Sequence, residues 1–164
     1  PPRRMEAEVV RDCVLHAGGG LDPKLGGPDL PGSDGMASRR RSIYFHHSPS
    51  SQMDFLKVFD GADPTEAYQR HISIVPHQAL ALFNSELTHA QSRQLAHKFN
   101  ATRADDAKFV QAAYEQILTR GPRADEVALC VEFLKTQTAA NARLRAREKL
   151  VHALFNHHEF VTIR

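Results

Sequence analysis

The sequence predicts an all-α domain, an irregular bundle of about five to seven helices with a long loop rich in glycine and proline. Two observations carry this prediction. Apolar residues recur at spacings of three and four along most of the 164 residues, as on the buried face of a helix. Glycine, proline, asparagine and aspartate stand where those patterns stop, as at helix ends. We treat 1–164 as a single helical domain and 18–40 as its glycine-rich loop.

The first predicted helix runs from Arg3 to Ala17. Its apolar stripe consists of Met5, Val9, Val10, Cys13 and Val14. Gly18-Gly19-Gly20 ends it, because glycine readily adopts the left-handed conformation found after a helix. Seven of the nine glycines lie between Gly18 and Ser38. A phosphate-binding loop is the alternative for this stretch, but no strand precedes it and no Gly-Lys-Ser/Thr follows it.

Two short elements follow the loop. Arg41 to His46 favours a short extended segment, since Ile43 and its aromatic neighbours suit a pleated surface. Gln52 to Asp60 indicates a short buried helix or a turn, and both interpretations stay open. Gly61 to Pro64 is a turn signal.

Pro76 marks the first turn of a central helix, where its missing N–H costs nothing. We expect this helix to be buried, with Leu80 and Phe83 directed inward. Asn84-Ser85 interrupts it before a second helix, from Glu86 to Phe99. The inward residues of that helix are Leu87, Ala90, Leu95 and Phe99.

Three more helices are predicted after this point. Asp105 or Asp106 caps the first, which ends at Gly121-Pro122. Ala124 to Thr136 forms the second, and Asn141 caps the last. Their apolar stripes are Phe109, Val110, Ala113, Ile117 and Leu118; Val127, Cys130, Val131 and Leu134; and Leu144, Val151, Leu154 and Phe155. Short polar connections imply antiparallel neighbours.

Composition excludes some partners. A net charge of +2 is too small to imply nucleic acid by itself. No stretch approaches the ~20 apolar residues of a membrane helix, so we expect no membrane insertion. The oligomeric state stays open. Cys13 and Cys130 are either small buried hydrophobes or, in an exported protein, a disulfide.

A polar cluster beside the glycine-rich loop is the best candidate for binding. Its members are His46, His47, Arg70, His71 and His77. The alternative is that these histidines are structural, with Arg70 bridging to a carboxylate such as Asp54 or Asp60.

No catalytic or metal-ligating set is predicted. Neither His-Glu-x-x-His nor Gly-x-Ser-x-Gly occurs. His157-His158-Glu159 is contiguous, and neighbouring side chains on a helix point about 100° apart, so we expect no common site there. Glu126 and Glu132 are expected on a solvated helix face.

The order of several segments resembles a known family. These are RRMEAEVVRD, GGGLDPKLGGP, RRRSIYFHHSPSSQMDFLKVFDGADPTEAYQRHISIVPHQALALFNS, AYEQILTRGPRADE and LVHALFNHHEFVTIR. They resemble a planctomycete-specific C-terminal domain of unknown function that accompanies planctomycete cytochrome c domains in large exported proteins. Two positions depart from the family pattern: Ala67 stands where a cysteine is common, and Arg123-Ala124 replaces a Pro-Thr helix cap.

The resemblance implies an exported protein with c-type haem elsewhere in the parent chain. This chain lacks Cys-x-x-Cys-His, so we expect no cofactor within it. Because it begins at Pro1 without methionine, we expect a fragment of a longer chain. We interpret it as a helical module that is structural or binds partners, namely neighbouring domains of the parent chain. The alternative is a subdomain that completes a redox or metal-dependent hydrolytic site together with those domains.

Overall fold

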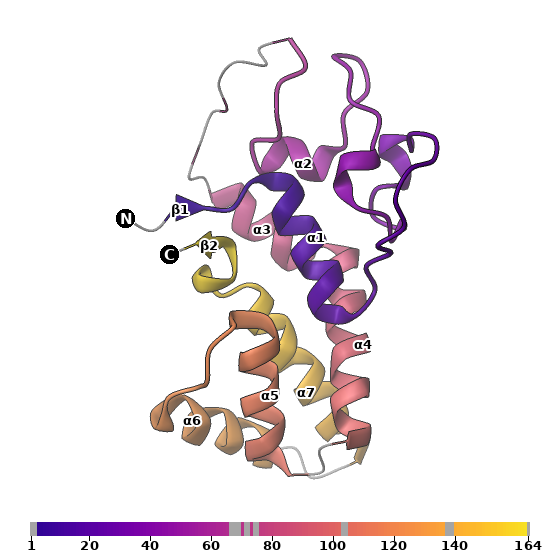
Figure 1. Ribbon diagram of the computed structural model, residues 1–164. Helices are drawn as coiled ribbons and strands as arrows, with labels where there is room; N and C mark the ends of the chain where they lie inside the picture. Colours follow the sequence, from indigo (N-terminus) through magenta and orange to yellow (C-terminus); the bar gives the residue numbers. More distant parts are fainter. Residues whose placement is uncertain are drawn as a thin grey trace.

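A computed structural model describes residues 3–65, 70, 73, 76–102, 105–136 and 140–163. Within them the chain forms seven α-helices, three short 3-10 helices and a two-stranded sheet (Figure 1). The α-helices are α1 (Ala7–Gly18), α2 (Asp54–Val58), α3 (Pro76–Asn84), α4 (Glu86–Thr102), α5 (Asp106–Leu118), α6 (Ala124–Lys135) and α7 (Ala140–Phe155). The 3-10 helices are η1 (Gly32–Asp34), η2 (Ser42–Tyr44) and η3 (His158–Val161). The predicted all-α fold is confirmed.

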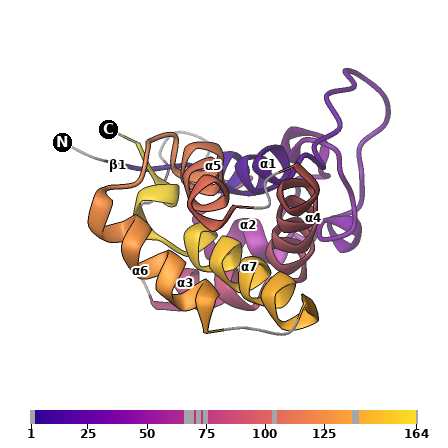
Figure 2. The ribbon, with the colours of Figure 1, turned by 90° about the horizontal axis from the view of Figure 1, so that it is seen from below.

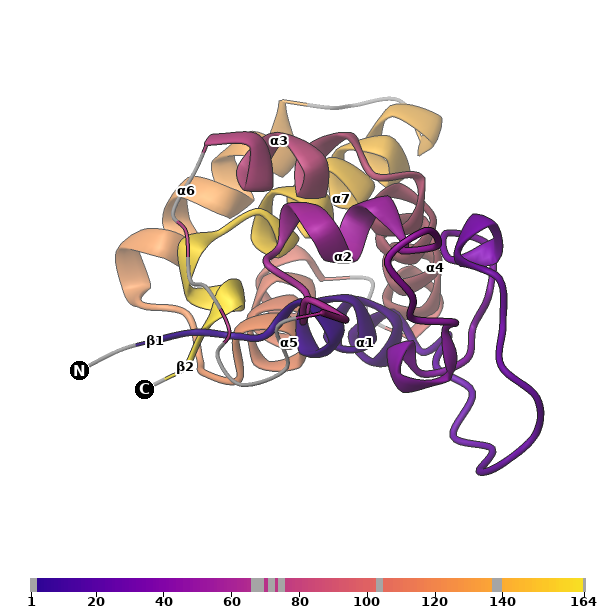
Figure 3. The same cartoon turned by 90° about the horizontal axis from the view of Figure 1, so that it is seen from above.

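The sheet joins the two ends of the described chain. Strand β1 (Arg3–Arg4) pairs antiparallel with β2 (Thr162–Ile163), and Figures 1 and 3 show the ends side by side. The prediction that the first helix begins at Arg3 is therefore wrong, since α1 begins at Ala7. Pairing between residues at opposite ends of the sequence leaves no trace in local periodicity.

Helix α1 follows the predicted pattern closely. Val10 and Val14 are fully buried, and Gly19 caps the helix in the left-handed conformation with φ 82°. A Cβ on Gly18 would lie 2.2 Å from the side chain of Gln91, so glycine allows α1 to approach α4 closely. Val9, predicted on the buried stripe, is instead 38% exposed.

The second half of the chain is a helical bundle. Helix α7 packs along α4 and also against α5 and α6 (Figures 1 and 2). The predicted stripe of α5 is buried throughout, and Asp105 caps this helix by accepting from the N–H of Lys108 at 3.2 Å. Asn141, predicted to cap the last helix, lies inside α7. Among the described residues, no helix is both long and apolar enough to cross a membrane.

Helix α3 begins at Pro76 and ends at Asn84 as predicted, but the predicted burial is wrong. Leu80 is 55% exposed and Phe83 51% exposed. Leu82 and Gln78 are buried instead, and the Gln78 amide donates to the Ser73 carbonyl at 3.2 Å. A polar side chain thus fixes the orientation of this helix. Ala90 of α4, also predicted inward, is exposed.

Three local predictions are corrected or decided. Arg41 to His46 is not an extended segment: Ser42–Tyr44 forms η2, with only an isolated bridge between Phe45 and Leu30. The stretch from Gln52 to Asp60 contains the helix α2, which decides between helix and turn. Both cysteines are free thiols.

The end of α5 also differs from the prediction. Thr119, not Gly121, takes the left-handed conformation, with φ 55°. Helix α6 then begins after Arg123, whose N–H donates to the Glu126 carboxylate at 2.7 Å. This bond caps the start of α6. Glu126, predicted on a solvated face, is therefore engaged, whereas Glu132 is exposed.

Candidate functional site

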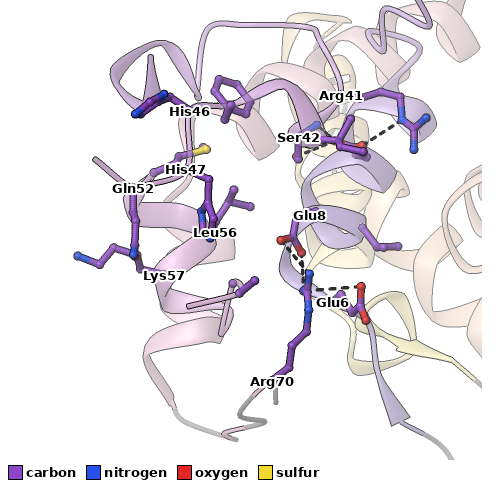
Figure 4. Close-up of a pocket in the computed structure, with 17 residues that line it drawn as sticks. Glu6, Glu8, Arg41, Ser42, His46, His47, Gln52, Leu56, Lys57 and Arg70 are labelled. Atoms are coloured by element: carbon purple, nitrogen blue, oxygen red, sulfur yellow. Dashed lines mark hydrogen bonds and ion pairs between the residues drawn. The ribbon is translucent and has the colours of Figure 1, made fainter. Parts of the chain in front are cut away.

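A cleft of about 380 Å³ lies between α1, η2 and α2 (Figure 4). Its apolar lining includes Val9, Ile43, Phe45, Met53 and Leu56. Its charged or titratable lining includes Glu6, Glu8, Asp12, Arg41, His46, His47, Lys57 and Arg70. The cleft therefore combines an apolar surface with charges of both signs.

Arg11 holds the glycine-rich loop against α1 and so positions one wall of the cleft. Its side chain is fully buried and donates to the carbonyls of Gly35 (2.6 and 3.0 Å), Ser38 (2.6 Å) and Arg40 (2.9 Å). The guanidinium also lies 4.8 Å from the centre of the Phe45 ring. Burial lowers the Arg11 pKa to about 10, so the group remains charged at neutral pH. A planar cation with several donors suits this cage of carbonyls.

Asp12 fixes the start of η2. Its Oδ1 accepts from the Ser42 N–H at 2.8 Å and from the Ser42 hydroxyl at 2.7 Å. The Ser42 hydroxyl also accepts from Arg11 at 3.3 Å and is buried. It is committed to the fold rather than placed as a nucleophile. This turn leaves the next residue, Ile43, 70% exposed at the rim of the cleft.

Arg70 closes the cleft near the start of α1. It donates to both carboxylate oxygens of Glu8, at 2.8 and 3.3 Å, and lies 3.6 Å from Glu6 (Figure 4). Burial alone would raise the Glu8 pKa, but the hydrogen bond and charge of Arg70 outweigh it, so the pKa is lowered. Glu8 is therefore ionised at neutral pH. Arg70 does form a salt bridge, but its predicted partners were wrong.

Residues 1–134 match the family model PSD1, described as a protein of unknown function (DUF1553). The chain belongs to this family. No curated protein and no solved structure matches it. The matched region contains every residue of the cleft in this DUF1553 domain.

The structure brings together three of the five predicted binding residues. His46, His47 and Arg70 line the cleft of the DUF1553 domain, and Nδ1 of His46 lies 2.7 Å from Asp29. His77 is exposed on α3 and does not line the cleft. His71 lies outside the described residues, as does Ala67.

Sequence reasoning missed the acidic residues that α1 contributes. Glu8 and Asp12 are four residues apart, so they share one face of the helix. The buried Arg11 was missed as well. It follows the buried Val10 directly in the sequence. The spacing of the two acids was a usable signal, whereas nothing local separates a buried arginine from a solvated one.

A second cluster corrects another expectation about this DUF1553 domain. The potential ligand atoms of His157, His158 and Glu159 lie within 4.8 Å of one another. We had expected their side chains to diverge as on an α-helix. They converge because the chain has left α7: His157 is extended, with φ −71° and ψ 139°, and η3 begins after it. This cluster lies beyond the residues that match the family model.

Proposed function

We propose that this DUF1553 domain is a partner-binding module of a large exported protein, and that its cleft receives a segment of a neighbouring domain of the parent chain. One observation carries the proposal. The cleft is preformed, and at its rim Ile43 is 70% exposed while Arg70 and Glu8 form an ion pair. Apolar anchors flanked by charges are typical of protein-binding sites.

The rigidity of the wall supports binding. Arg11 and Asp12 fix the loop and η2 through buried or half-buried hydrogen bonds. A wall that is already ordered loses little conformational entropy when a partner docks, so more of the contact energy becomes affinity. The exposed apolar surface of Ile43 supplies that energy, and Val9 extends it on α1.

The charges define the kind of segment that fits. Glu6 lies at the rim with 60% of its side chain exposed, and Lys57 lines the cleft from α2. A segment with an apolar side chain between an acidic and a basic one would complement this arrangement. The resemblance to planctomycete proteins supports export and supports a parent chain that carries c-type haem in another domain.

Hydrogen exchange on the parent chain tests the proposal. Amides from Ile43 to His47 should exchange more slowly in the full-length protein than in the isolated domain. The Ile43→Asp variant should lose that protection and bind the separately expressed remainder of the parent chain about tenfold more weakly or worse. Leu25→Asp is the matched control, because Leu25 is 76% exposed and lies outside the cleft. Equal exchange in both proteins, with unchanged binding by Ile43→Asp, would refute it.

The second candidate is a subdomain that completes a redox or metal-dependent hydrolytic site with its neighbours. His47 favours it, since the His47 imidazole and the Glu8 carboxylate, two potential metal ligands, line the same cleft. Metal analysis of the full-length protein separates the two functions. Metal that is lost on His47→Ala but retained on His77→Ala would support the second candidate over the first.

A further inference from the structure

We propose that His157, His158 and Glu159 form a site for a first-row transition-metal ion such as Zn²⁺. The three residues lie where α7 gives way to η3, far from the cleft in sequence, and their ligand atoms lie within 4.8 Å of one another. Two imidazoles and one carboxylate are a ligand set that zinc accepts in proteins. This inference is independent of the proposed partner-binding function.

The spacing requires only small movements of the side chains. Bonds from zinc to nitrogen and oxygen ligands are about 2.0–2.2 Å, so ligand atoms in a tetrahedral site lie roughly 3.3 Å apart. His158 is exposed, so its ring can turn to close the difference. The rings of His157 and His158 already lie with their centres 4.5 Å apart.

The carboxylate is held in place by an ion-pair network. Arg120 donates to both oxygens of Glu159, at 2.8 and 3.0 Å, and is itself held by Glu126 through two bonds of 2.8 Å. Supporting hydrogen bonds of this kind orient metal ligands, and each carboxylate oxygen keeps a lone pair for the ion.

The cluster opens onto a cavity. This cavity has a volume of about 470 Å³, and its lining includes Thr119, Arg120, His158 and Glu159. Three protein ligands leave coordination positions open on a zinc ion. The cavity offers room there for water or for an oxygen atom of another molecule.

Calorimetric titration of the metal-free 164-residue domain with Zn²⁺ tests the site. We expect one binding event whose Kd weakens about tenfold or more in His158→Ala and in His157→Ala. The matched control is His97→Ala, because Nε2 of His97 lies 3.3 Å from Glu148 in another exposed histidine–carboxylate pair. That variant should bind as the wild type does. Titration curves for His158→Ala that coincide with the wild type would overturn the proposal.

Thermal unfolding gives a second readout that does not depend on calorimetric stoichiometry. Zn²⁺ should raise the Tm of the wild type, because an ion that binds only the folded state stabilises it by mass action. His158→Ala should unfold at the wild-type Tm without zinc and gain little from its addition. An equal rise in Tm for both proteins would place the bound zinc elsewhere and refute the site.

Discussion

Two arginines are fully buried in the described part of this domain, one in each half of the chain, and they are held in different ways. Arg11 of α1 donates chiefly to backbone carbonyls of the glycine-rich loop. Arg147 of α7 donates to the carboxylate of Asp106 at 2.7 Å. Each guanidinium also lies within 5 Å of an aromatic ring centre, Phe45 and Phe109 respectively. The same residue type therefore organises a loop in one half and joins helices in the other.

The two arginines differ in the groups that would lose a hydrogen-bond partner if the arginine were replaced. The Ser38 and Arg40 carbonyls that Arg11 satisfies are only part-buried, so water can replace the lost donors there, although the Gly35 carbonyl is buried. Asp106, the first residue of α5, is 8% exposed, so water has little access to its carboxylate where it meets Arg147 of α7. Removing a partner from a buried charge costs far more than removing a donor from a group that water can reach. We therefore expect a global effect at Arg147 and a more local one at Arg11.

The largest effect is predicted for Arg147→Met. This change keeps an apolar stem of similar length but leaves Asp106 with only the half-exposed Arg143 as an ion-pair partner among the described residues. The free energy of unfolding should fall by about 3–5 kcal/mol, as for other broken buried pairs. Denaturant titration measures it. Arg145→Met on the exposed side of α7 is the control and should change stability by less than about 0.5 kcal/mol. A loss below about 1 kcal/mol for Arg147→Met would refute the larger effect predicted for this arginine.

A smaller and more local effect is predicted for Arg11→Met. Global stability should fall by about 1–3 kcal/mol, because the Ser38 and Arg40 carbonyls exchange protein donors for water and the buried Gly35 carbonyl loses its donors. Hydrogen exchange should accelerate most at loop amides such as those of Asp22 and His46, which are bonded to Arg39 and Leu30. Arg41→Met, whose side chain is 48% exposed, is the control. Uniform acceleration over all helices would contradict a local role.

This comparison also explains what the sequence could predict about the fold. The buried faces of α5 and α7 repeat every three or four residues, so residues such as Phe109 and Val151 were assigned correctly. The orientation of α3 was wrong because buried Gln78 sets it, and an apolar count assigns Leu80 to the core instead. Long-range polar contacts have no local signature, and the bond from Arg11 to Gly35, 24 positions further along the chain, is one of them.

In the candidate cleft, too, the sequence revealed residues that lie close together along the chain and missed those that only the fold brings near. His46, His47 and Arg70 were found because polar residues clustered near the loop in the sequence, and all three line the cleft. Glu8 and Asp12 were missed because they belong to a helix that precedes the loop, and only the fold brings them opposite Arg70 and Ser42. Chain proximity thus predicted one side of the site and could not predict the other.

Mild acid should lower the stability of the domain through His152, which lies in the second half of the chain. His152 of α7 is buried and stacks on His89 with ring centres 4.2 Å apart. Burial, together with the charge of His89, lowers the His152 pKa below 6.5. The unfolded chain therefore takes up this proton at a higher pH than the folded chain. The stability contributed by neutral His152 is present above pH 6.5 and is lost as the pH falls towards the folded-state pKa.

Denaturant titrations at about pH 7.5 and about pH 5.5 measure this loss. The wild type should be less stable at the lower pH, and His152→Gln should show a smaller difference between the two conditions. His16→Gln, an exposed position on α1, should retain the wild-type difference. An unchanged pH dependence in His152→Gln would show that other groups cause it.

The smallest effect concerns how the two halves end their helices. Helix α1 ends with Gly19 at φ 82°, whereas α5 ends with Thr119 at φ 55°. A left-handed conformation costs a residue with a Cβ about 1–2 kcal/mol, and glycine avoids that cost. Glycine also makes the unfolded chain more flexible, which lowers the free energy of unfolding by about 0.4–1 kcal/mol. Thr119→Gly should therefore stabilise the domain by about 0.5–1 kcal/mol. Thr136→Gly is the control, since Thr136 caps α6 at φ −65° and has no such strain to relieve. That change should destabilise by about 0.5–1 kcal/mol. If both changes destabilise equally, Thr119 is not strained, and the difference between the two helix ends has no energetic consequence.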